Sequence, residues 1–309
     1  MVPLRVCLIA SLTSTPTRMN DPGFTEVLLS LQRQSPRRFA QIVFNVPRRM
    51  NRTGEEYPAS LNYGPGIRVN RCERDYGPIT KLVPTIALLR ERVQRIRDYT
   101  GASLEKAALP FHIVLVDDDT HYPRRLAMSF QAKIPEVLAN ISESASGFRW
   151  IPPFRQTDGD RSELVYHQTV RNVTWKTRKL PHNIPDVSEA WGGWRIPLLP
   201  LLQAEAEGPT IEQRLEHALA IPECRLSDDV VITALLDSLD VPRYVVPALR
   251  HFVHQLPVGM RDKTALHFSS VGGSSMYVRY LRCLELMRSQ VKPFPEVLIS
   301  HRDRILNEA

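Results

Sequence analysis

The stretch FHIVLVDDDTHYP (residues 111–123) decides the fold class. Its first six residues form a short apolar run, which predicts a strand buried on both faces of a sheet. Asp117, Asp118 and Asp119 follow at the carboxyl end of that strand. Ligands of open parallel α/β sheets bind beyond the carboxyl ends of the strands. The stretch therefore predicts a central strand that leads into an acidic binding site.

Strand and helix patterns alternate on both sides of this stretch. The alternation predicts an α/β fold with a mostly parallel central sheet flanked by helices. The loops after the first, third and fourth strands contain STPTR, ERDYGPITK and DDDTHYP, and we expect them to form the walls of the site. No repeat or linker interrupts the chain. The expected strands are 5–12, 40–47, 66–71 and 111–116, and the expected helices are 22–33, 84–99, 123–139, 210–220, 228–239 and 277–288.

Composition places the chain among soluble globular proteins. The length of 309 residues suffices to bury a sizeable core, and the 43% hydrophobic and 24% charged residues are an ordinary balance. No apolar run approaches the ~20 residues of a membrane helix. The N-terminal apolar run is more typical of a strand than of a signal peptide. Widely spaced cysteines without a CxxC pair predict buried free thiols in a reducing compartment. We therefore expect a cytoplasmic protein. The cysteines are Cys7, Cys72, Cys224 and Cys283.

The net charge of +7 is unevenly placed. Residues 1–100 hold 16 Lys and Arg against 8 Asp and Glu, a balance of +8, so all the excess positive charge lies in the first third. A basic segment predicts an anionic partner, such as a nucleotide, a nucleic acid or a membrane surface. The alternative is an arginine-rich solvated surface, which composition alone favours.

The three aspartates predict a metal site. Adjacent carboxylates beside a buried strand repel one another and lose hydration, and a divalent cation relieves both effects. Mg²⁺ and Mn²⁺ favour carboxylate oxygens and retain coordination positions for phosphate. The alternative is a solvated acidic turn that starts a helix at Pro123.

The segment RDYGPITKL (74–82) has the residue types of a phosphate-binding turn. Arg74 and Lys81 are cations that suit phosphate, and Asp75 suits the hydrogen bonds of ribose or a base. A Gly-Pro turn lets the backbone approach a ligand closely. An ordinary strand-to-helix turn with surface charges is the alternative.

The segment LSDDVVITALL (226–236) predicts a helix that starts with two carboxylates, Asp228 and Asp229. The helix dipole stabilises both as anions, and one of them, facing a cleft, suits a general base. The alternative is helix capping, which Asp228 would perform beside Ser227.

For two further segments the sequence is compatible with either a ligand-binding or a structural role. In EAWGGWR (189–195), two Trp around a Gly pair suit a surface for a stacked sugar ring, or else an aromatic core with a glycine bend. His267 precedes a glycine-serine loop and suits a metal ligand, although a lone histidine is more often structural.

Together these segments resemble glycosyltransferases of the GT-A fold, in the family-2-like group that uses nucleotide-sugar donors. They are similar in particular to small bacterial and chlorella-virus members. RDYGPITKL is similar to the DYGPxTK segment of that set, and VDDDTHYP to its DxD metal motif with the Tyr-Pro continuation. SLTSTPTR (11–18) resembles the nucleotide loop after the first strand, and LLSLQRQS with IVFNVP resembles the first helix and second strand. EAWGGW resembles the acceptor segment, SDDVVIT the catalytic-base helix and YVRYLRCLE (277–285) the closing helix.

The resemblance implies one catalytic domain over 1–309, with a nucleotide-sugar-binding half at 1–120 and an acceptor and catalytic-base half at 121–309. It implies a bound Mn²⁺ or Mg²⁺, a UDP- or GDP-sugar donor and a glycan acceptor, and it replaces nucleic acid as the partner of the basic third. Arg18, Arg74 and Lys81 would then face the diphosphate. The implied metal ligands are Asp117, Asp119 and His267, and the implied donor-binding residues are Thr13, Arg18, Asp75, Tyr76, Lys81, Asp117 and Asp118. The implied acceptor-binding residues are Trp191, Gly192, Gly193 and Trp194, and the base of an inverting reaction is Asp229 or Asp228, with Asp229 favoured.

Three other functions remain as alternatives. A nucleotidyltransferase would carry a glycine-rich phosphate loop after the first strand, where STPTR has no glycine. A phosphohydrolase of the haloacid-dehalogenase type would carry Thr four residues after its first Asp, where this chain has His121. A non-catalytic carbohydrate-binding module is suggested by Ala190, which stands where the glycosyltransferase pattern has Gly. The intact aspartate runs favour an enzyme.

Overall fold

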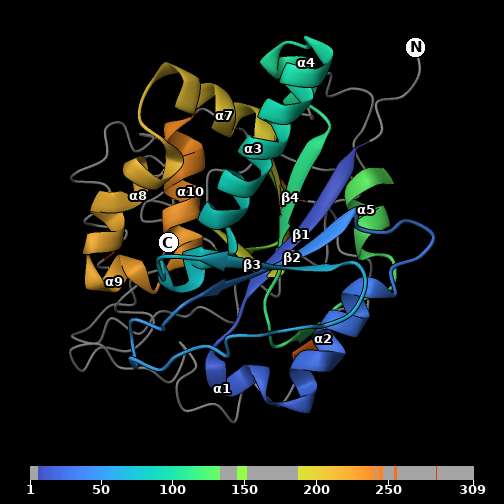
Figure 1. Ribbon diagram of the computed structural model, residues 1–309, viewed down its shortest axis with the longest axis vertical. Coiled ribbons are helices and arrows are strands. Elements are labelled where there is room, and N and C mark those ends of the chain that lie inside the picture. Colours follow the sequence, from blue (N-terminus) through green and yellow to red (C-terminus); the bar gives the residue numbers. More distant parts are fainter. Residues whose placement is uncertain are drawn as a thin grey trace, which may run out of the picture.

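The computed structural model describes residues 6–132, 145–151, 187–239, 241, 243–245, 254–255 and 283. Within them, a seven-stranded sheet of order β3-β2-β1-β4-β7-β6-β8 crosses the molecule (Figure 1). Strands β1 to β4 run parallel, and β7 pairs antiparallel with both β4 and β6. The predicted α/β fold with a mostly parallel sheet is confirmed. The strands are β1 (Cys7–Thr13), β2 (Gln41–Pro47), β3 (Ile67–Cys72), β4 (Phe111–Leu115), β5 (Thr120–His121), β6 (Ala145–Ile151), β7 (Val187–Pro197), β8 (Arg243–Val245) and β9 (His254–Gln255).

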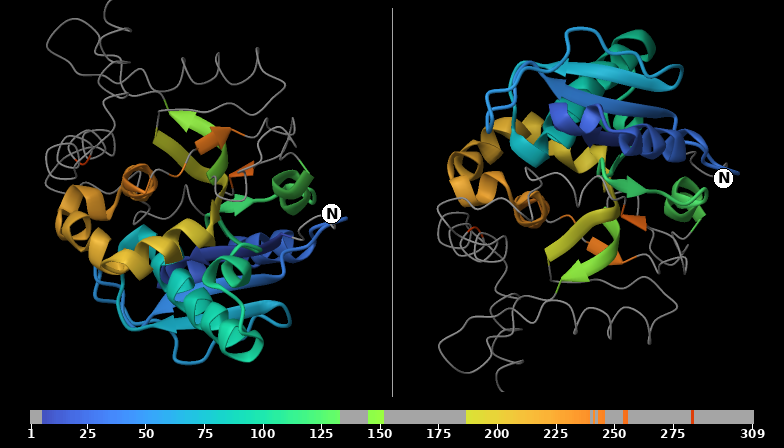
Figure 2. Two further views of the ribbon diagram at one scale, coloured as in Figure 1. Left: turned by 90° about the horizontal axis from the view of Figure 1, so that it is seen from above. Right: turned by 90° about the horizontal axis from the view of Figure 1, so that it is seen from below.

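Helices cover both faces of the parallel strands (Figure 2). Alternate side chains of β1 face opposite layers: Leu8, Ala10 and Leu12 pack against α1, α2 and α5, whereas Ile9 packs on the side of α3, α4 and α7 to α10. Burial on both faces explains why β1, β2 and β4 are mostly apolar in sequence. The helices are α1 (Pro16–Met19), α2 (Pro22–Gln32), the 3₁₀ helix η1 (Gly77–Lys81), α3 (Val83–Thr100), α4 (Leu104–Ala108), α5 (Leu126–Ala132), α7 (Leu198–Glu207), α8 (Ile211–Ala220), α9 (Pro222–Arg225) and α10 (Asp228–Ser238).

Most of the predicted elements agree with these bounds to within a few residues. The main difference lies after residue 120, where the predicted helix 123–139 is described only as α5, from Leu126. Helix α7 and strand β7 were not predicted from the sequence, and β7 extends the sheet by pairing antiparallel with β4. The predicted helix 277–288 lies outside the described residues apart from Cys283. None of the described helices combines the length and apolarity that crossing a bilayer requires.

A buried polar network joins the carboxyl half of β1 and β2 to the start of α3. The Ser11 hydroxyl donates to the carbonyl of Lys81 at 2.5 Å and lies 2.6 Å from the Thr85 hydroxyl. The Asn45 amide donates to both hydroxyls and accepts from Asn70 at 2.8 Å. Because buried polar groups are costly when unpaired and rigid when satisfied, the network fixes the backbone of Lys81 against the sheet.

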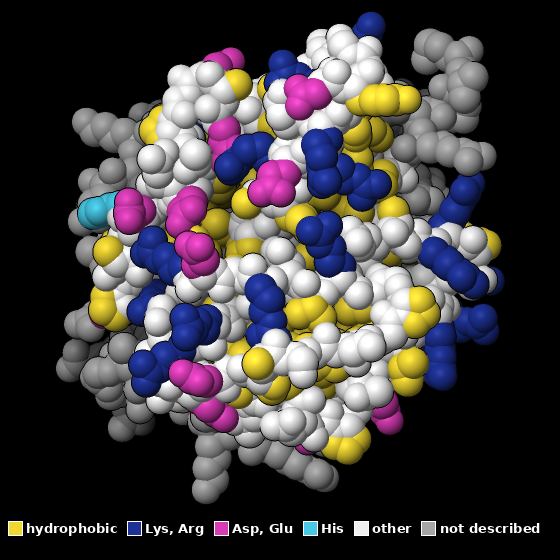
Figure 3. All heavy atoms as spheres, viewed as in Figure 1, with side chains coloured by type: hydrophobic (Ala, Val, Ile, Leu, Met, Phe, Trp, Pro, Cys, Tyr) yellow, Lys and Arg dark blue, Asp and Glu magenta, His cyan; other side chains and the backbone are white. Residues whose placement is uncertain are grey.

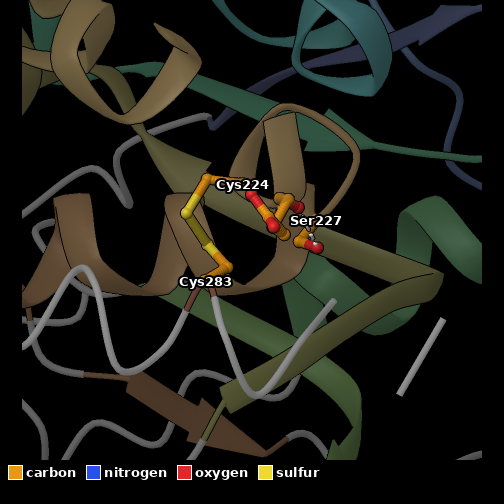
Figure 4. The surroundings of a disulfide bond; sticks show 4 residues. Cys224, Ser227 and Cys283 are labelled. Atoms are coloured by element: carbon orange, nitrogen blue, oxygen red, sulfur yellow. Dashed lines mark hydrogen bonds between the residues drawn. A yellow bond between two sulfur atoms is a disulfide. The ribbon is translucent and has the colours of Figure 1, made fainter. Parts of the chain in front are cut away.

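Cys224 on α9 and Cys283 form a disulfide, with their Cα atoms 4.7 Å apart (Figure 4). The prediction of four free thiols is therefore wrong for this pair, while Cys7 and Cys72 are free. The pairing escaped the sequence analysis because the two cysteines are 59 residues apart and only tertiary structure brings them together. Disulfides persist mainly in oxidising compartments, so this bond argues against the expected cytoplasmic location.

His112 on β4 is fully buried beside Arg195 on β7, another buried side chain. Within the described part of the chain neither ring nitrogen of His112 has a hydrogen-bond partner. Burial, with a smaller effect of the Arg195 charge, holds the pKa of His112 well below 6.5. The histidine is therefore neutral in the folded protein at pH values where it is protonated in the unfolded chain.

We expect this difference to make stability pH-dependent. The folded-state pKa lies below the unfolded value, so the unfolded chain binds more protons and stability falls as pH decreases below 6.5. From pH 7.5 to 5.5 the contribution of His112 to the free energy of unfolding falls by about 1.4 kcal/mol. Urea unfolding at the two pH values, compared between wild type and His112→Leu, measures this contribution. Identical pH dependence of the two proteins would show that His112 does not contribute.

Candidate functional site

Side chains from four separate segments meet at the carboxyl edge of the parallel strands. Asp117, Asp118 and Asp119 follow β4, Arg18 follows β1 on α1, Lys81 ends η1, and Asp228 begins α10. The carboxyl ends of parallel strands lie at the same edge of a sheet, which is why these distant segments converge. We call these six residues the carboxylate cluster: Arg18, Lys81, Asp117, Asp118, Asp119 and Asp228.

Arg18 bridges two of the aspartates. Its Nη1 lies 2.5 Å from Oδ1 of Asp118 and 3.4 Å from Oδ2 of Asp119. The Ser14 hydroxyl donates to the other Asp118 oxygen at 2.6 Å. All four side chains are buried, so the contact is little screened by water. The loop after β1 thus binds the aspartates after β4 through charge-assisted hydrogen bonds.

Lys81 bridges the other two aspartates of the carboxylate cluster, Asp117 and Asp228. Its Nζ lies 2.8 Å from Oδ1 of Asp117 and 2.7 Å from Oδ2 of Asp228. Burial by itself lowers the pKa of Lys81, but Asp117, Asp228 and Asp229 outweigh that effect and hold the pKa well above its ordinary value. Lys81 is therefore a permanent cation that joins the aspartates after β4 to the start of α10.

The sequence leaves Asp228 open between a general base and a helix cap, and in the structure its carboxylate pairs with Lys81. Ser227, the expected partner in capping, donates its hydroxyl to the carbonyl of Glu223 at 2.8 Å. Asp229 is the more exposed of the two helix aspartates. The structure thus gives the two carboxylates different surroundings, one in a buried ion pair and one partly open to solvent.

The carboxylate cluster has more negative than positive charge, since four carboxylates face two cations. Their oxygens are the donors that Mg²⁺ and Mn²⁺ prefer, and a divalent cation would balance the excess charge. Among the described residues, no three His, Cys, Asp or Glu side chains converge as a ready metal site. In donor chemistry and charge the aspartates suit a divalent cation, but in this arrangement Arg18 and Lys81 contact Asp119 and Asp117. His267 lies outside the described residues.

Asp75 organises the turn that carries Lys81. Its carboxylate accepts hydrogen bonds from the backbone amides of Asn51 at 2.7 Å and Gly77 at 2.8 Å, and from the Thr80 hydroxyl at 3.3 Å. The Asn51 side chain also donates to the Asp75 carbonyl. These bonds occupy most of the acceptor capacity of the carboxylate. Asp75 therefore joins the loop after β2 to η1, and this geometry favours a positioning role over the predicted contact with ribose or base.

Arg74 and Tyr76 point toward α8 rather than toward the cluster. The Tyr76 hydroxyl donates to Glu212 at 2.5 Å, and the Arg74 guanidinium lies over the Tyr76 ring and within 4 Å of Glu212 and Glu216. Arg74 is exposed, so these ion pairs contribute little to stability. The structure therefore places Arg74 away from the cluster to which Lys81 belongs, contrary to the prediction that both face a diphosphate.

Two tyrosines that the sequence analysis did not select support the cluster. The Tyr57 hydroxyl donates to the Ser14 carbonyl at 2.8 Å, and the Tyr122 hydroxyl accepts from the backbone amide of Asp117 at 2.7 Å. Burial raises the pKa of both phenols, so both are neutral. Tyr122 lies in the quoted DDDTHYP segment, whereas nothing in the polar loop around Tyr57 indicated this contact. Thr13, at the end of β1, donates its hydroxyl to the Asn45 carbonyl at 3.0 Å.

The predicted acceptor surface is wrong for Trp194, which is fully buried in the core beside β4. A buried ring presents no face on which a sugar can stack. Gly193 has a φ of 91°, and a Cβ there would lie 3.3 Å from the Phe130 ring. This glycine therefore allows α5 to approach the sheet. Of the same motif, Trp191 and Gly192 lie within β7, but their side-chain surroundings are outside the described part of the structure.

The surface of the first third carries its excess positive charge in scattered positions. On the face shown in Figure 3, Lys and Arg side chains are spread over the molecule with acidic side chains among them. Arg33, Arg37, Arg38 and Arg68 are exposed, whereas Arg18 is buried in the cluster. The expected solvated arginine surface is thus present.

We expect Gly77 to be more sensitive to substitution than a matched glycine elsewhere. Gly77 and Gly101 have φ of 65° and 67°, and a Cβ at Gly77 would lie 2.7 Å from the Arg225 carbonyl, whereas Gly101 has nothing within 4 Å. Gly101→Ala should lower the free energy of unfolding by about 1 kcal/mol through backbone strain, and Gly77→Ala by ~3 kcal/mol or more through strain and overlap. Chemical denaturation measures both. Equal losses of unfolding free energy in the two variants would show that α9 moves away from the added Cβ at no energetic cost.

Comparisons with known proteins give no family assignment. No protein-family model matches the chain, and no curated protein matches it. Among solved structures, the apo form of mouse xyloside xylosyltransferase 1 is similar with 17% identity and a TM-score of 0.23, over 73% of this chain and 76% of that one. A TM-score this low supports no argument about function.

Proposed function

We propose that this chain is a glycosyltransferase that moves a sugar from a UDP- or GDP-sugar to a hydroxyl of a glycan acceptor, assisted by Mn²⁺ or Mg²⁺. The observation that carries the proposal is the carboxylate cluster. Two buried cations, three buried carboxylates and the partly exposed carboxylate of Asp117 lie together at the edge of a parallel sheet where ligands of such sheets bind. The order of the motifs along the chain, which resembles that of GT-A enzymes, is the second support.

The cluster suits a nucleoside diphosphate in both charge and position. Asp117 and Asp119 would hold the metal ion, which supplies neutralising charge for the departing diphosphate. Arg18 and Lys81 would bind phosphate oxygens, since both are permanent cations next to that place. Asp118 and Thr13 would then contact the ribose or sugar. Asp75 and Tyr76 would shape the turn that presents Lys81, as their hydrogen bonds to Gly77 and Glu212 indicate.

Asp229 is the favoured general base. In the proposed step the acceptor hydroxyl gives its proton to the Asp229 carboxylate while its oxygen forms a bond to the anomeric carbon. The bond from that carbon to the diphosphate oxygen breaks, and the diphosphate leaves with the electron pair. Attack from the face opposite the leaving group inverts the configuration. Asp228 suits this role less well because its oxygen already pairs with Lys81.

Three alternatives differ from this proposal in what they would bind. A nucleotidyltransferase would use the same cluster for a nucleoside triphosphate and transfer the nucleotide. A carbohydrate-binding module would bind glycans without a nucleotide, and the burial of Trp194 removes one surface that such a module would need. A phosphohydrolase would bind neither a nucleotide-sugar nor a nucleoside triphosphate tightly.

A donor screen tests the proposal. Thermal unfolding is measured with UDP-sugars, GDP-sugars, nucleoside triphosphates and free glycans, each with and without Mn²⁺. We expect a Mn²⁺-dependent rise in Tm with one nucleotide-sugar, followed by release of the matching nucleoside diphosphate when an acceptor is added. Asp119→Ala should abolish both, whereas Asp98→Ala, an exposed aspartate on α3, should change neither. Stabilisation by triphosphates or glycans alone, or full activity of Asp119→Ala across Mn²⁺ concentrations, would refute the proposal.

A further inference from the structure

Arg18 and Lys81 each contact one oxygen of an aspartate that the resemblance implies as a metal ligand, Asp119 and Asp117 respectively. Each cation contacts two aspartates: Arg18 contacts Asp118 and Asp119, and Lys81 contacts Asp117 and Asp228. Asp117 and Asp119, the two implied metal ligands among the described residues, are therefore partners of a protein cation. The side chains of Arg18 and Lys81 are 10% and 6% exposed, so neither cation has ready access to water as an alternative partner.

We propose that Arg18 and Lys81 gate the metal site, so that a divalent cation binds tightly only together with the donor diphosphate. The inference rests on the proposed function and goes beyond it, because it assigns the order and coupling of binding to two named side chains. A metal ion at Asp117 and Asp119 would compete with these cations for the two carboxylates, and the diphosphate supplies new partners for the cations.

Electrostatics explains why metal ion alone should bind weakly. A divalent cation at Asp117 and Asp119 would lie close to two buried positive charges, and charge repulsion is strong where water is excluded. It would also take Asp117 from Lys81 and Asp119 from Arg18. Each buried cation would then keep fewer carboxylate partners, Asp228 for Lys81 and Asp118 for Arg18, and weakening a buried ion pair is unfavourable. Metal binding in the absence of an anion therefore has two opposing costs.

The diphosphate removes both costs at once. Its oxygens carry the negative charge that balances the metal ion together with the two side-chain cations, and they accept hydrogen bonds from Arg18 and Lys81. Metal ion and diphosphate should then strengthen each other's binding by the same factor, as linkage requires. Lys81 adds a connection to α10, because the same ammonium group holds Asp228.

Direct measurement of Mn²⁺ binding tests the gate without an activity assay. Free Mn²⁺ is titrated by electron paramagnetic resonance in the absence and presence of UDP or GDP, with wild type, Lys81→Met and Arg18→Met. Wild type should bind Mn²⁺ about tenfold or more tightly with one of the diphosphates than without. Lys81→Met should bind Mn²⁺ alone about tenfold more tightly than wild type, and its gain from the diphosphate should fall. Lys106→Met, an exposed lysine on α4, is the matched control and should behave as wild type.

Arg18→Met keeps the test decisive if Lys81→Met does not fold. It removes the other cation, so it should also raise the affinity for Mn²⁺ alone. Far-ultraviolet circular dichroism checks that both variants are folded. Wild type that binds Mn²⁺ equally well with and without diphosphate, or variants whose affinity for Mn²⁺ alone is unchanged, would overturn the gate while leaving a metal-assisted glycosyltransferase intact. Absence of Mn²⁺ binding by every protein, even with UDP and GDP, would overturn both the gate and the metal in the proposed function.

Discussion

Asp229→Asn is expected to lower the rate of sugar transfer by about 10²- to 10⁴-fold while leaving donor binding close to that of wild type. The amide keeps the shape of the side chain but accepts no proton at neutral pH, so the acceptor hydroxyl loses its base. Asp229 is partly exposed beside the cluster, whereas donor contacts are assigned to Arg18 and Lys81. Rate constants for transfer, set beside Kd values for the donor with Mn²⁺, separate the two effects.

Asp228→Asn is the informative companion. It removes one of the two carboxylates that hold Lys81, so it should weaken donor binding and lower Tm instead of acting on transfer alone. If Asp229→Asn transfers sugar at the wild-type rate, the base is another residue. If Asp228→Asn loses transfer with unchanged donor affinity, the roles of the two aspartates are exchanged.

Strands β1, β2 and β4 were predictable because they are buried on both faces. Residues 7–13 and 111–115 are continuous apolar runs that end in polar turn residues, and the order of strands and helices implied parallel pairing. Strand β7 was not predictable in the same way. Its central Trp-Gly-Gly-Trp sequence interrupts any alternation, and only the close approach of α5 to Gly193 explains the glycine there.

The location of the site could be predicted from the direction of the strands, but which cation pairs with which carboxylate could not. Parallel strands bring the segments after β1, β3 and β4 to one edge, so Arg18, Lys81 and the aspartates were predicted to lie together. Arg74 and Lys81 belong to one segment, and both are cations. The turn at Gly77 directs one to the surface of α8 and the other into the cluster, and this depends on contacts with α8 and α9 that local sequence does not contain.

Removal of the Cys224–Cys283 disulfide should lower the free energy of unfolding by about 4 kcal/mol. The bond closes a loop across 59 residues, and a crosslink of that span limits the conformations of the unfolded chain by roughly this amount. Urea unfolding of Cys224→Ala and of Cys283→Ala, without reductant, measures the loss. The two variants should lose similar amounts because each removes the same bond.

Reductant provides the decisive comparison, because it cleaves the bond without altering a side chain elsewhere. A dithiol should destabilise wild type toward the level of the two variants while leaving the variants themselves unchanged, and thiol titration of the unfolded wild type should rise from two reactive groups to four. Cys7→Ala, which replaces a free and partly buried thiol, should keep the response of wild type to the dithiol. Four thiols in wild type purified from an oxidising compartment would show that the bond does not form. Two thiols would support folding in such a compartment, because a reducing compartment would not maintain the bond. The bond fixes α9, in which Cys224 lies three residues before Ser227, ahead of the start of α10 (Figure 4).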